Sequence, residues 1–236
     1  PPGSELEGIA AQRPAAPVPK QSACQGNGWG EDTTVYLSPQ IPNEGQPLRV
    51  IVTSYRDLAP AELVVWGPDG KAVRPTLKRF GGPPHSWVAT LPAPVSGSWR
   101  ASFGDGDDVW ACNAFTVRER GAAFRTCKAG DENGLGGGPV WRAARSWGPR
   151  TESLYAAFVE SLFDYPADDD RTWTNLHDIL RDPERNLLFN HLGRDEDARL
   201  RLVPDCADLP FFLRTYFAWK MDLPIAFRKC NRGRAG

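Results

Sequence analysis

Between about residues 31 and 118 the sequence is a succession of short, strand-like segments separated by turn residues. The segments are TTVYLSP, PLRVIVTS, AELVVWG, KAVRPTLKR, SWVATLP, GSWRASFG and DDVWACNAFTV. Polar and apolar side chains alternate clearly in residues 98–103 and only weakly in residues 48–53, and GPDG at 67–70 supplies the residues of a tight turn. Short strands at intervals of about 8–12 residues are typical of an antiparallel sandwich. We therefore predict an immunoglobulin-like β-sandwich over residues 23–118.

Such a sandwich serves either as a spacer and packing partner or as a ligand-binding platform of exposed aromatic side chains. The aromatic candidates are Trp66, Trp87, Trp99 and Trp110. Because tryptophan in strands more often fills the core, we favour the spacing or packing role.

Composition changes on both sides of the predicted sandwich. Residues 1–22 are rich in proline and alanine and lack hydrophobic periodicity, which predicts an extended tether. Residues 119–150 form a long linker whose KAGDENGLGGGP segment is rich in glycine. A linker of this length between ordered parts is unusual unless a covalent bond holds it, and Cys127 could supply that bond. Residues 151–236 are predicted to be helical.

The helical prediction rests on apolar residues at helical spacing. In TESLYAAFVESLFDY one stripe comprises Leu154, Phe158, Ser161 and Leu162. We expect Thr151 to cap this helix and Pro166 to end it. TWTNLHDILRD predicts a second helix with Leu176, Ile179 and Leu180 as its buried set. A third is expected to start at Pro183 and end at Gly193.

The stretch VPDCADLPFFLRTYFAWK, residues 203–220, predicts a further helix with an unusual start. We expect Asp205 to be its N-cap, Cys206 its first residue and Asp208 the acidic partner of a capping box. The apolar set is Leu209, Phe212, Leu213, Tyr216 and Phe217. Since Cys206 precedes Leu209 and Leu213 by helical spacing, it is expected on the same inward face, at the tip of the helix.

A thiol at a helix N-terminus can act as a nucleophile. The positive end of the helix dipole and the unpaired N–H groups favour the thiolate, and those N–H groups could also stabilise the oxyanion formed by attack on an amide. The neighbouring carboxylates of Asp205 and Asp208 work against the thiolate. A nucleophile at Cys206 therefore needs a histidine as its base.

The three histidines do not complete such a dyad by position. His85 lies in a GGPPH loop of the predicted sandwich, while His177 and His191 lie on predicted helices before Cys206. Each of these two is more often a surface or capping residue than a base. No histidine follows Cys206, although papain-type sites take their base from a downstream strand.

The five cysteines indicate disulfides rather than a zinc site, because no CxxC or CxH spacing occurs among them. An odd number in an exported protein implies two bridges and one free thiol. The pairing that we favour among several joins Cys24 to Cys112 and Cys127 to Cys230, which leaves Cys206 free.

Cysteine usage and the nine tryptophans favour an extracytoplasmic location: periplasmic, cell-surface or secreted. A start at Pro1 is expected if an export signal has been removed, and the basic RKCNRGRAG before Gly236 suggests a gene product that continues further. No apolar run approaches the roughly 20 residues of a membrane span. The net charge of −1 predicts no nucleic-acid or anionic-membrane partner.

We predict no metal and no cofactor. The acidic groups at residues 104–108, 131–133 and 168–170 lack the ligand spacing of an EF-hand and are interpreted as solvated loops. GLGGG at 134–138 lacks the lysine and the preceding strand of a phosphate-binding loop.

The run from WTNLHDILRDPERNLLFNHLG through DCADLPFFLRTYFAWKMDLPIAF resembles an uncharacterised family of secreted bacterial proteins related to NlpC/P60 and papain-like cysteine peptidases. The resemblance covers roughly residues 150–232, and DCADLPFFLRTYFAWK is its most specific part. It implies the helical, N-terminal half of a papain-like domain, with Cys206 at the position of the family's cysteine. The family's histidine, on a later GHV-type strand, has no counterpart in this chain.

Two functions of different classes follow. In the first, the chain is an exported cysteine hydrolase or acyl-transferase for peptide or cell-wall amides, with Cys206 as nucleophile. Its base then comes from a downstream segment or a second polypeptide. In the second, the chain is a non-catalytic envelope or assembly protein that uses the papain-like half as a scaffold, with Cys206 as a buried small hydrophobe. We favour the first.

Overall fold

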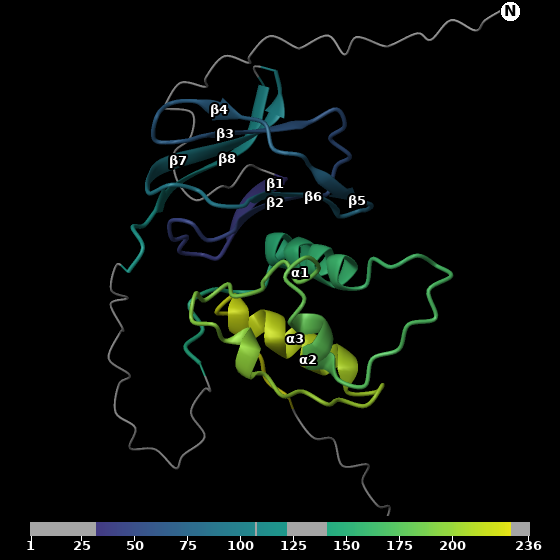
Figure 1. Ribbon diagram of the computed structural model, residues 1–236. Helices are drawn as coiled ribbons and strands as arrows, with labels where there is room; N and C mark the ends of the chain where they lie inside the picture. Colours follow the sequence, from purple (N-terminus) through teal and green to yellow (C-terminus); the bar gives the residue numbers. More distant parts are fainter. Residues whose placement is uncertain (1–31, 107, 122–140, 228–236) are drawn as a thin grey trace, which may run out of the picture.

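The computed structural model describes residues 32–106, 108–121 and 141–227. Within these ranges the chain is a mixed α+β molecule with two antiparallel sheets and three α-helices (Figure 1). No helix in these ranges is both long enough and apolar enough to cross a membrane.

Each sheet has four strands. The first has the order β1 (Thr33–Ser38), β2 (Leu48–Ser54), β6 (His85–Leu91) and β5 (Lys78–Phe80). The second has the order β4 (Ala72–Val73), β3 (Glu62–Trp66), β7 (Gly97–Asp105) and β8 (Asp108–Val117). The sheets face each other across one apolar core, in which Val50 and Val52 of β2 and Phe103 of β7 are fully buried.

The aromatic candidates of the sandwich do not form an open platform. Trp66 and Trp87 are buried, and Trp87 packs on Phe103 with 4.9 Å between the ring centroids. Trp99 and Trp110 are half-buried against the same core. These side chains therefore contribute to packing.

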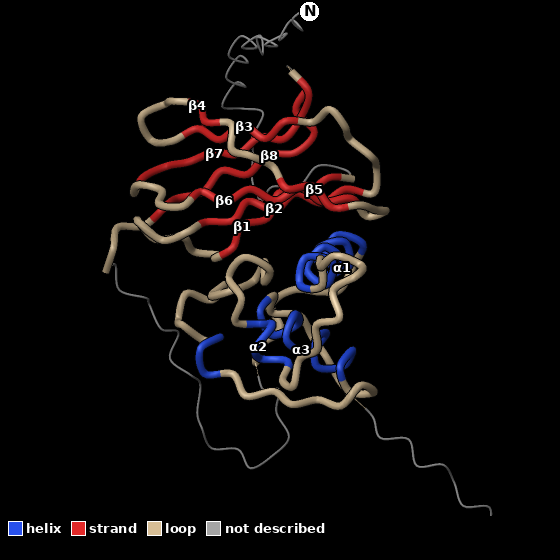
Figure 2. The backbone as a smooth tube through the Cα atoms, turned by 45° about the vertical axis from the view of Figure 1, so that its right-hand side comes forward, coloured by secondary structure: helices blue, strands red, loops and turns tan. Residues whose placement is uncertain are grey.

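The segment KAVRPTLKR was predicted to be a single strand, and that prediction is wrong. It forms β4 and β5, which belong to different sheets (Figure 2). Pro75 lies between them. Since proline has no N–H to donate to a strand ladder, the pairing stops there and the chain crosses from one sheet to the other.

The helices cover the outer face of the β1-β2-β6-β5 sheet. α1 (Pro149–Leu162) lies against this face, and α2 (Leu176–Leu180), the 3₁₀ turn η2 (Asp197–Arg199) and α3 (Leu209–Lys220) lie beyond it (Figure 2). The second apolar core joins the sheet residues Tyr36, Ile51, Phe80 and Val88 to the helical residues. β2 is buried along its whole length, which explains the weak alternation in residues 48–53.

The predicted helical stripes are confirmed where helices form. Leu154, Phe158, Ser161 and Leu162 of α1 are buried, as are Leu176, Ile179 and Leu180 of α2. The capping prediction for α1 is wrong, because the helix begins at Pro149 after Gly148 and Thr151 lies in its first turn. The Thr151 hydroxyl instead accepts a hydrogen bond of 2.9 Å from the Gly148 N–H. The helix also ends at Leu162, before Pro166.

The helix predicted between Pro183 and Gly193 is absent, and this stretch consists of turns. The Asp182 carboxylate accepts a hydrogen bond from the Glu184 N–H, and the Asn186 side chain accepts one from the Leu188 N–H, both 2.9 Å long. Such side-chain bonds compete with helical backbone bonds. Asn190 has a positive φ of 52°, which also ends any helix at that point.

The described end of the predicted linker is fixed to the helical region. The indole N–H groups of Trp141 and Trp147 donate to the carbonyl oxygens of Leu223 and Pro224, at 2.9 and 2.7 Å. The predicted tether 1–22 and most of the linker 119–150 lie outside the described residues, so those boundaries stay predictions.

Candidate active site

Cys206 lies in a turn that leads directly into α3. Its thiol is free and its side chain is exposed. The Asp205 carboxylate accepts hydrogen bonds from the N–H groups of Ala207 and Asp208, both 2.9 Å long. The Asp205 carbonyl also accepts one from the Leu209 N–H, at 3.0 Å. Asp205 therefore shapes the turn that presents the thiol to solvent.

The prediction that Cys206 shares the inward face of the helix is wrong. α3 begins at Leu209, three residues later than expected, and Leu209 itself is only partly buried. The deeply buried face of α3 includes Leu213, Tyr216 and Phe217, which were predicted correctly, together with Ala218 and Lys220. The first turn extends beyond the core, so the thiol at its tip is solvated.

The predicted oxyanion site is largely occupied by Asp205. The amides of Ala207 and Asp208 are bonded to its carboxylate and that of Leu209 to its carbonyl, which leaves only the Cys206 amide without a hydrogen bond in the described part of this turn. The Asp205 carboxylate would have to turn away to free two further donors.

None of the three histidines contacts Cys206 through a hydrogen bond. His177 is buried on α2, where its Nδ1 lies 3.1 Å from the backbone nitrogen and 3.0 Å from the carbonyl of Leu202. His191 is buried against Ser38, and His85 is in β6 beside Trp87. His177 therefore helps to position the segment that leads to Cys206, but this chain does not contain a hydrogen-bonded cysteine–histidine dyad within its described residues.

An open apolar groove of about 780 Å³ runs along α3 next to this turn. Asp208, two residues after Cys206, is one of its lining residues, whereas Cys206 itself is not. The apolar lining residues are Trp141, Leu200, Leu202, Phe211, Phe212, Trp219 and Phe227. Phe211 and Phe227 are more than half exposed and pack edge to face. A groove of this size and composition suits an extended apolar ligand or side chain.

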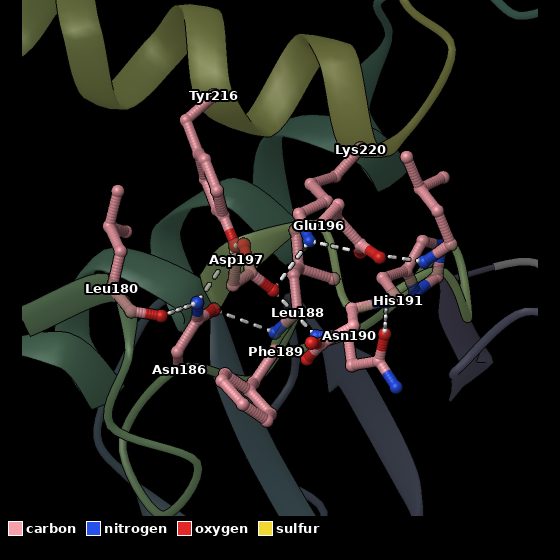
Figure 3. A network of polar contacts seen from close by, with 12 residues as sticks. Leu180, Asn186, Leu188, Phe189, Asn190, His191, Glu196, Asp197, Tyr216 and Lys220 are labelled. Atoms are coloured by element: carbon pink, nitrogen blue, oxygen red, sulfur yellow. Dashed lines mark hydrogen bonds and ion pairs between the residues drawn. The ribbon is translucent and has the colours of Figure 1, made fainter. Parts of the chain in front are cut away.

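The far end of α3 is held by a buried network of charges, shown in Figure 3. The fully buried Lys220 ammonium contacts the carboxylates of Glu196 and Asp197, the latter at 2.7 Å. Tyr216 donates its hydroxyl hydrogen to Asp197, also at 2.7 Å. The Asp197 carboxylate also accepts a hydrogen bond of 2.6 Å from the backbone N–H of Asn190.

The electrostatics of this network follow from burial and pairing. Burial alone would raise the pKa of Glu196, but the hydrogen bond and charge of Lys220 outweigh it and hold that pKa below its usual range. Burial and the charge of Asp197 raise the pKa of Tyr216 well above 10, so its hydroxyl stays protonated as a donor. Lys220, Asp197 and Tyr216 are buried, and we interpret the network as structural.

This network was not predicted from the sequence, although a signal was present. Lys220 follows Tyr216 and Phe217 at helical spacing and so belongs to the inward face. A lysine on that face requires buried anions. Glu196 and Asp197, in the polar run RDEDAR at 194–199, supply those anions.

The cysteines predicted to form bridges are only partly described. Cys112 of β8 is disulfide-bonded. Cys24, Cys127 and Cys230 lie outside the described residues, so the pairing stays a prediction. Within the described residues no three His, Cys, Asp or Glu side chains gather as they would around a metal ion.

Neither the comparison with protein-family models nor the search of curated proteins finds a match for this chain.

Proposed function

We propose that the chain supplies the nucleophile and the substrate groove of an exported cysteine hydrolase or acyl-transferase that acts on peptide or cell-wall amide bonds. The observation that carries the proposal is the free, exposed thiol of Cys206 at the start of α3, beside an apolar groove of about 780 Å³. The resemblance of DCADLPFFLRTYFAWK to NlpC/P60 and papain-like cysteine peptidases supports it.

The finer fold assignment belongs to the same proposal. The two four-stranded sheets support an immunoglobulin-like domain. α3, with a cysteine just before it, supports the helical half of a papain-like domain. The disulfide at Cys112 supports an extracytoplasmic location.

In the proposed reaction, a base removes the proton from Cys206, and the sulfur attacks the carbonyl carbon of an amide. The C–N bond then breaks, the amine leaves with a proton from the base, and an acyl thioester remains on the sulfur. Water completes hydrolysis, or an acceptor amine completes acyl transfer. Since the histidines lie elsewhere, the base comes from a segment or polypeptide outside the described residues.

Chemical rescue with imidazole tests this proposal, because free imidazole can replace a missing histidine base. The acylation of Cys206 by p-nitrophenyl octanoate and p-nitrophenyl acetate would be followed by p-nitrophenol release and intact mass. We expect imidazole to increase the rate of acylation of Cys206. The increase should be larger for the octanoyl ester than for the acetyl ester, because the octanoyl chain occupies the groove.

Two variants serve as controls. Cys206→Ser should abolish the mass adduct, and Thr215→Trp, which fills the groove from α3, should remove the preference for octanoate. Rates and ester preference equal to those of free cysteine would contradict the catalytic proposal.

The second candidate is a non-catalytic envelope or assembly scaffold. It is favoured by the occupation of the Ala207 and Asp208 amides by Asp205 and by the lack of a histidine bonded to Cys206. The same rescue experiment separates the two functions, since a scaffold predicts no imidazole-dependent selectivity.

A further inference from the structure

A second cavity, of about 610 Å³, lies between the sandwich and the helical region, away from Cys206. β1 contributes Tyr36, β8 contributes Phe115, the segment before α1 contributes Arg145, and the helical region contributes His191 and Met221. Its size is within the range of small-molecule sites.

Two polar atoms at this cavity are buried and have no hydrogen-bond partner: the Tyr36 hydroxyl and His191 Nε2. Tyr36 is 9% exposed and His191 3%. Thr34, on the same face of β1, is a polar neighbour that slightly lowers the pKa of Tyr36, but the Tyr36 hydroxyl makes no hydrogen bond of normal geometry to it. Buried polar atoms are nearly always paired, because an unpaired one is costly. Two such atoms lining one cavity indicate that a ligand with hydrogen-bonding groups completes it.

The charge at the cavity selects an anion. Arg145 is the one charged side chain among the described lining residues, and its guanidinium makes no hydrogen bond or ion pair in the described part of the chain. It lies close enough to affect the ionisation of both Tyr36 and His191. No aspartate or glutamate lines the described walls. A negatively charged group would therefore meet a cation and no opposing carboxylate.

Both orphaned groups can donate hydrogen bonds to an anion. Burial raises the pKa of Tyr36 to about 12, so the phenol keeps its proton. Burial lowers the pKa of His191 to about 3, so its ring is neutral. His191 Nδ1 lies 3.1 Å from Ser38 Oγ, and when that hydroxyl donates to Nδ1, Nε2 carries the hydrogen.

The remaining walls combine apolar and neutral polar side chains. Val35, Leu37, Phe115 and Met221 line the cavity together with small alanine side chains, and Gln40, Asn113, Ser146 and Thr151 add uncharged polar groups. The combination of a cation, hydrogen-bond donors and apolar side chains such as Phe115 and Met221 matches a compact organic acid.

We propose that this cavity binds a small organic acid, whose carboxylate accepts hydrogen bonds from Tyr36, His191 and Arg145 and whose apolar body packs against Phe115 and Met221. The proposal does not depend on Cys206, because the two cavities share no described lining residue.

The test uses benzoate as the probe and benzamide as its neutral isostere. Binding to the full chain, labelled with ¹⁵N-histidine, would be followed by NMR through the ring nitrogens of His191. We expect benzoate to shift the His191 Nε2 resonance saturably at concentrations up to about 10 mM, with benzamide at least about tenfold weaker.

Variants then locate the contacts. Arg145→Gln and Tyr36→Phe should each weaken benzoate binding by about tenfold or more. Arg142→Gln alters an exposed arginine on the same segment that does not line the cavity, and should leave binding unchanged. Equal unfolding temperatures would show that the variants are folded. No benzoate-dependent shift, equal affinity for benzamide, or equal weakening by Arg142→Gln would overturn the proposal.

Discussion

Replacing Lys220 with methionine should reveal how strongly the buried network holds the helical region. Lys220 is the cation that contacts both Glu196 and Asp197, and their side chains are 7% and 1% exposed. Lys220→Met keeps the length and apolar stem of the side chain but leaves two buried carboxylates without their counter-ion.

Breaking a buried ion pair by removing one partner typically costs about 3–5 kcal/mol. Two carboxylates lose their partner here, although Tyr216 and the Asn190 amide remain as donors to Asp197. We therefore expect Lys220→Met to lower the free energy of unfolding by about 3–5 kcal/mol at pH 7.

The loss should depend on pH in a defined direction. In the native protein the pKa of Glu196 is depressed, since Lys220 outweighs the effect of burial. Its stabilising contribution is thus present above the unfolded pKa of about 4.5 and is lost as pH falls through the lower folded value. In Lys220→Met the hydrogen bond and the charge of Lys220 are lost, while burial still raises the pKa of Glu196 and only backbone N–H groups such as that of Leu192 still lower it. Protonation of Glu196 then costs less in the variant, so its difference in stability from the native protein should shrink between pH 7 and pH 4.

Urea unfolding followed by tryptophan fluorescence and circular dichroism measures this difference in free energy. Lys78→Met provides the matched control, because Lys78 forms an exposed ion pair of 2.6 Å with Asp164 and should cost at most about 1 kcal/mol. The double variant Lys220→Met, Asp197→Asn should recover part of the loss. A cost below about 1 kcal/mol for Lys220→Met at pH 7 would refute the interpretation of the network.

Three further predictions concern buried residues of the helical region. Phe158→Ala, at a fully buried position of α1, should cost about 3–5 kcal/mol in urea unfolding, whereas Phe211→Ala, more than half exposed, should cost far less. Ser161→Ala should cost about 1 kcal/mol, because it removes the 2.8 Å hydrogen bond to the Arg185 carbonyl. Burial, with the charges of Lys220 and Arg145, lowers the pKa of His191 to about 3, against about 6.5 when unfolded, so stability should fall as pH decreases through this interval, by up to about 1.4 kcal/mol per unit. His191→Gln should flatten that dependence. If stability depends on pH in the same way in this variant, His191 is not the source of the dependence.

The elements that depend on local chain geometry were predictable. The stripe of Leu154, Phe158 and Leu162 is a property of helical periodicity alone, and its burial followed from it. β2 shows the limit of the same reasoning. Its weak alternation reflects burial on both faces, and the second face is covered by α1, about one hundred residues later in the chain.

Features that depend on distant partners were not predictable from pattern. The ring nitrogen of His191 meets the hydroxyl of Ser38, 153 residues away, and no spacing rule relates the two. The exposure of Cys206 depends on where the core ends along α3. The sequence pattern extends one turn beyond that point, because Leu209 and Phe212 continue the apolar spacing while only partly buried.

The position of the thiol follows from contacts at both ends of α3. At the far end, Lys220 anchors the helix through Glu196 and Asp197. At the near end, the segment before Cys206 is fixed on α2, where the Leu202 carbonyl accepts a hydrogen bond of 3.1 Å from the Leu176 N–H. A helix of 12 residues is about 18 Å long, so a small tilt at Lys220 displaces the thiol and the groove wall together. Buried charges therefore help to determine where the proposed nucleophile would meet a substrate, and a scaffold built on the same groove would depend on them equally.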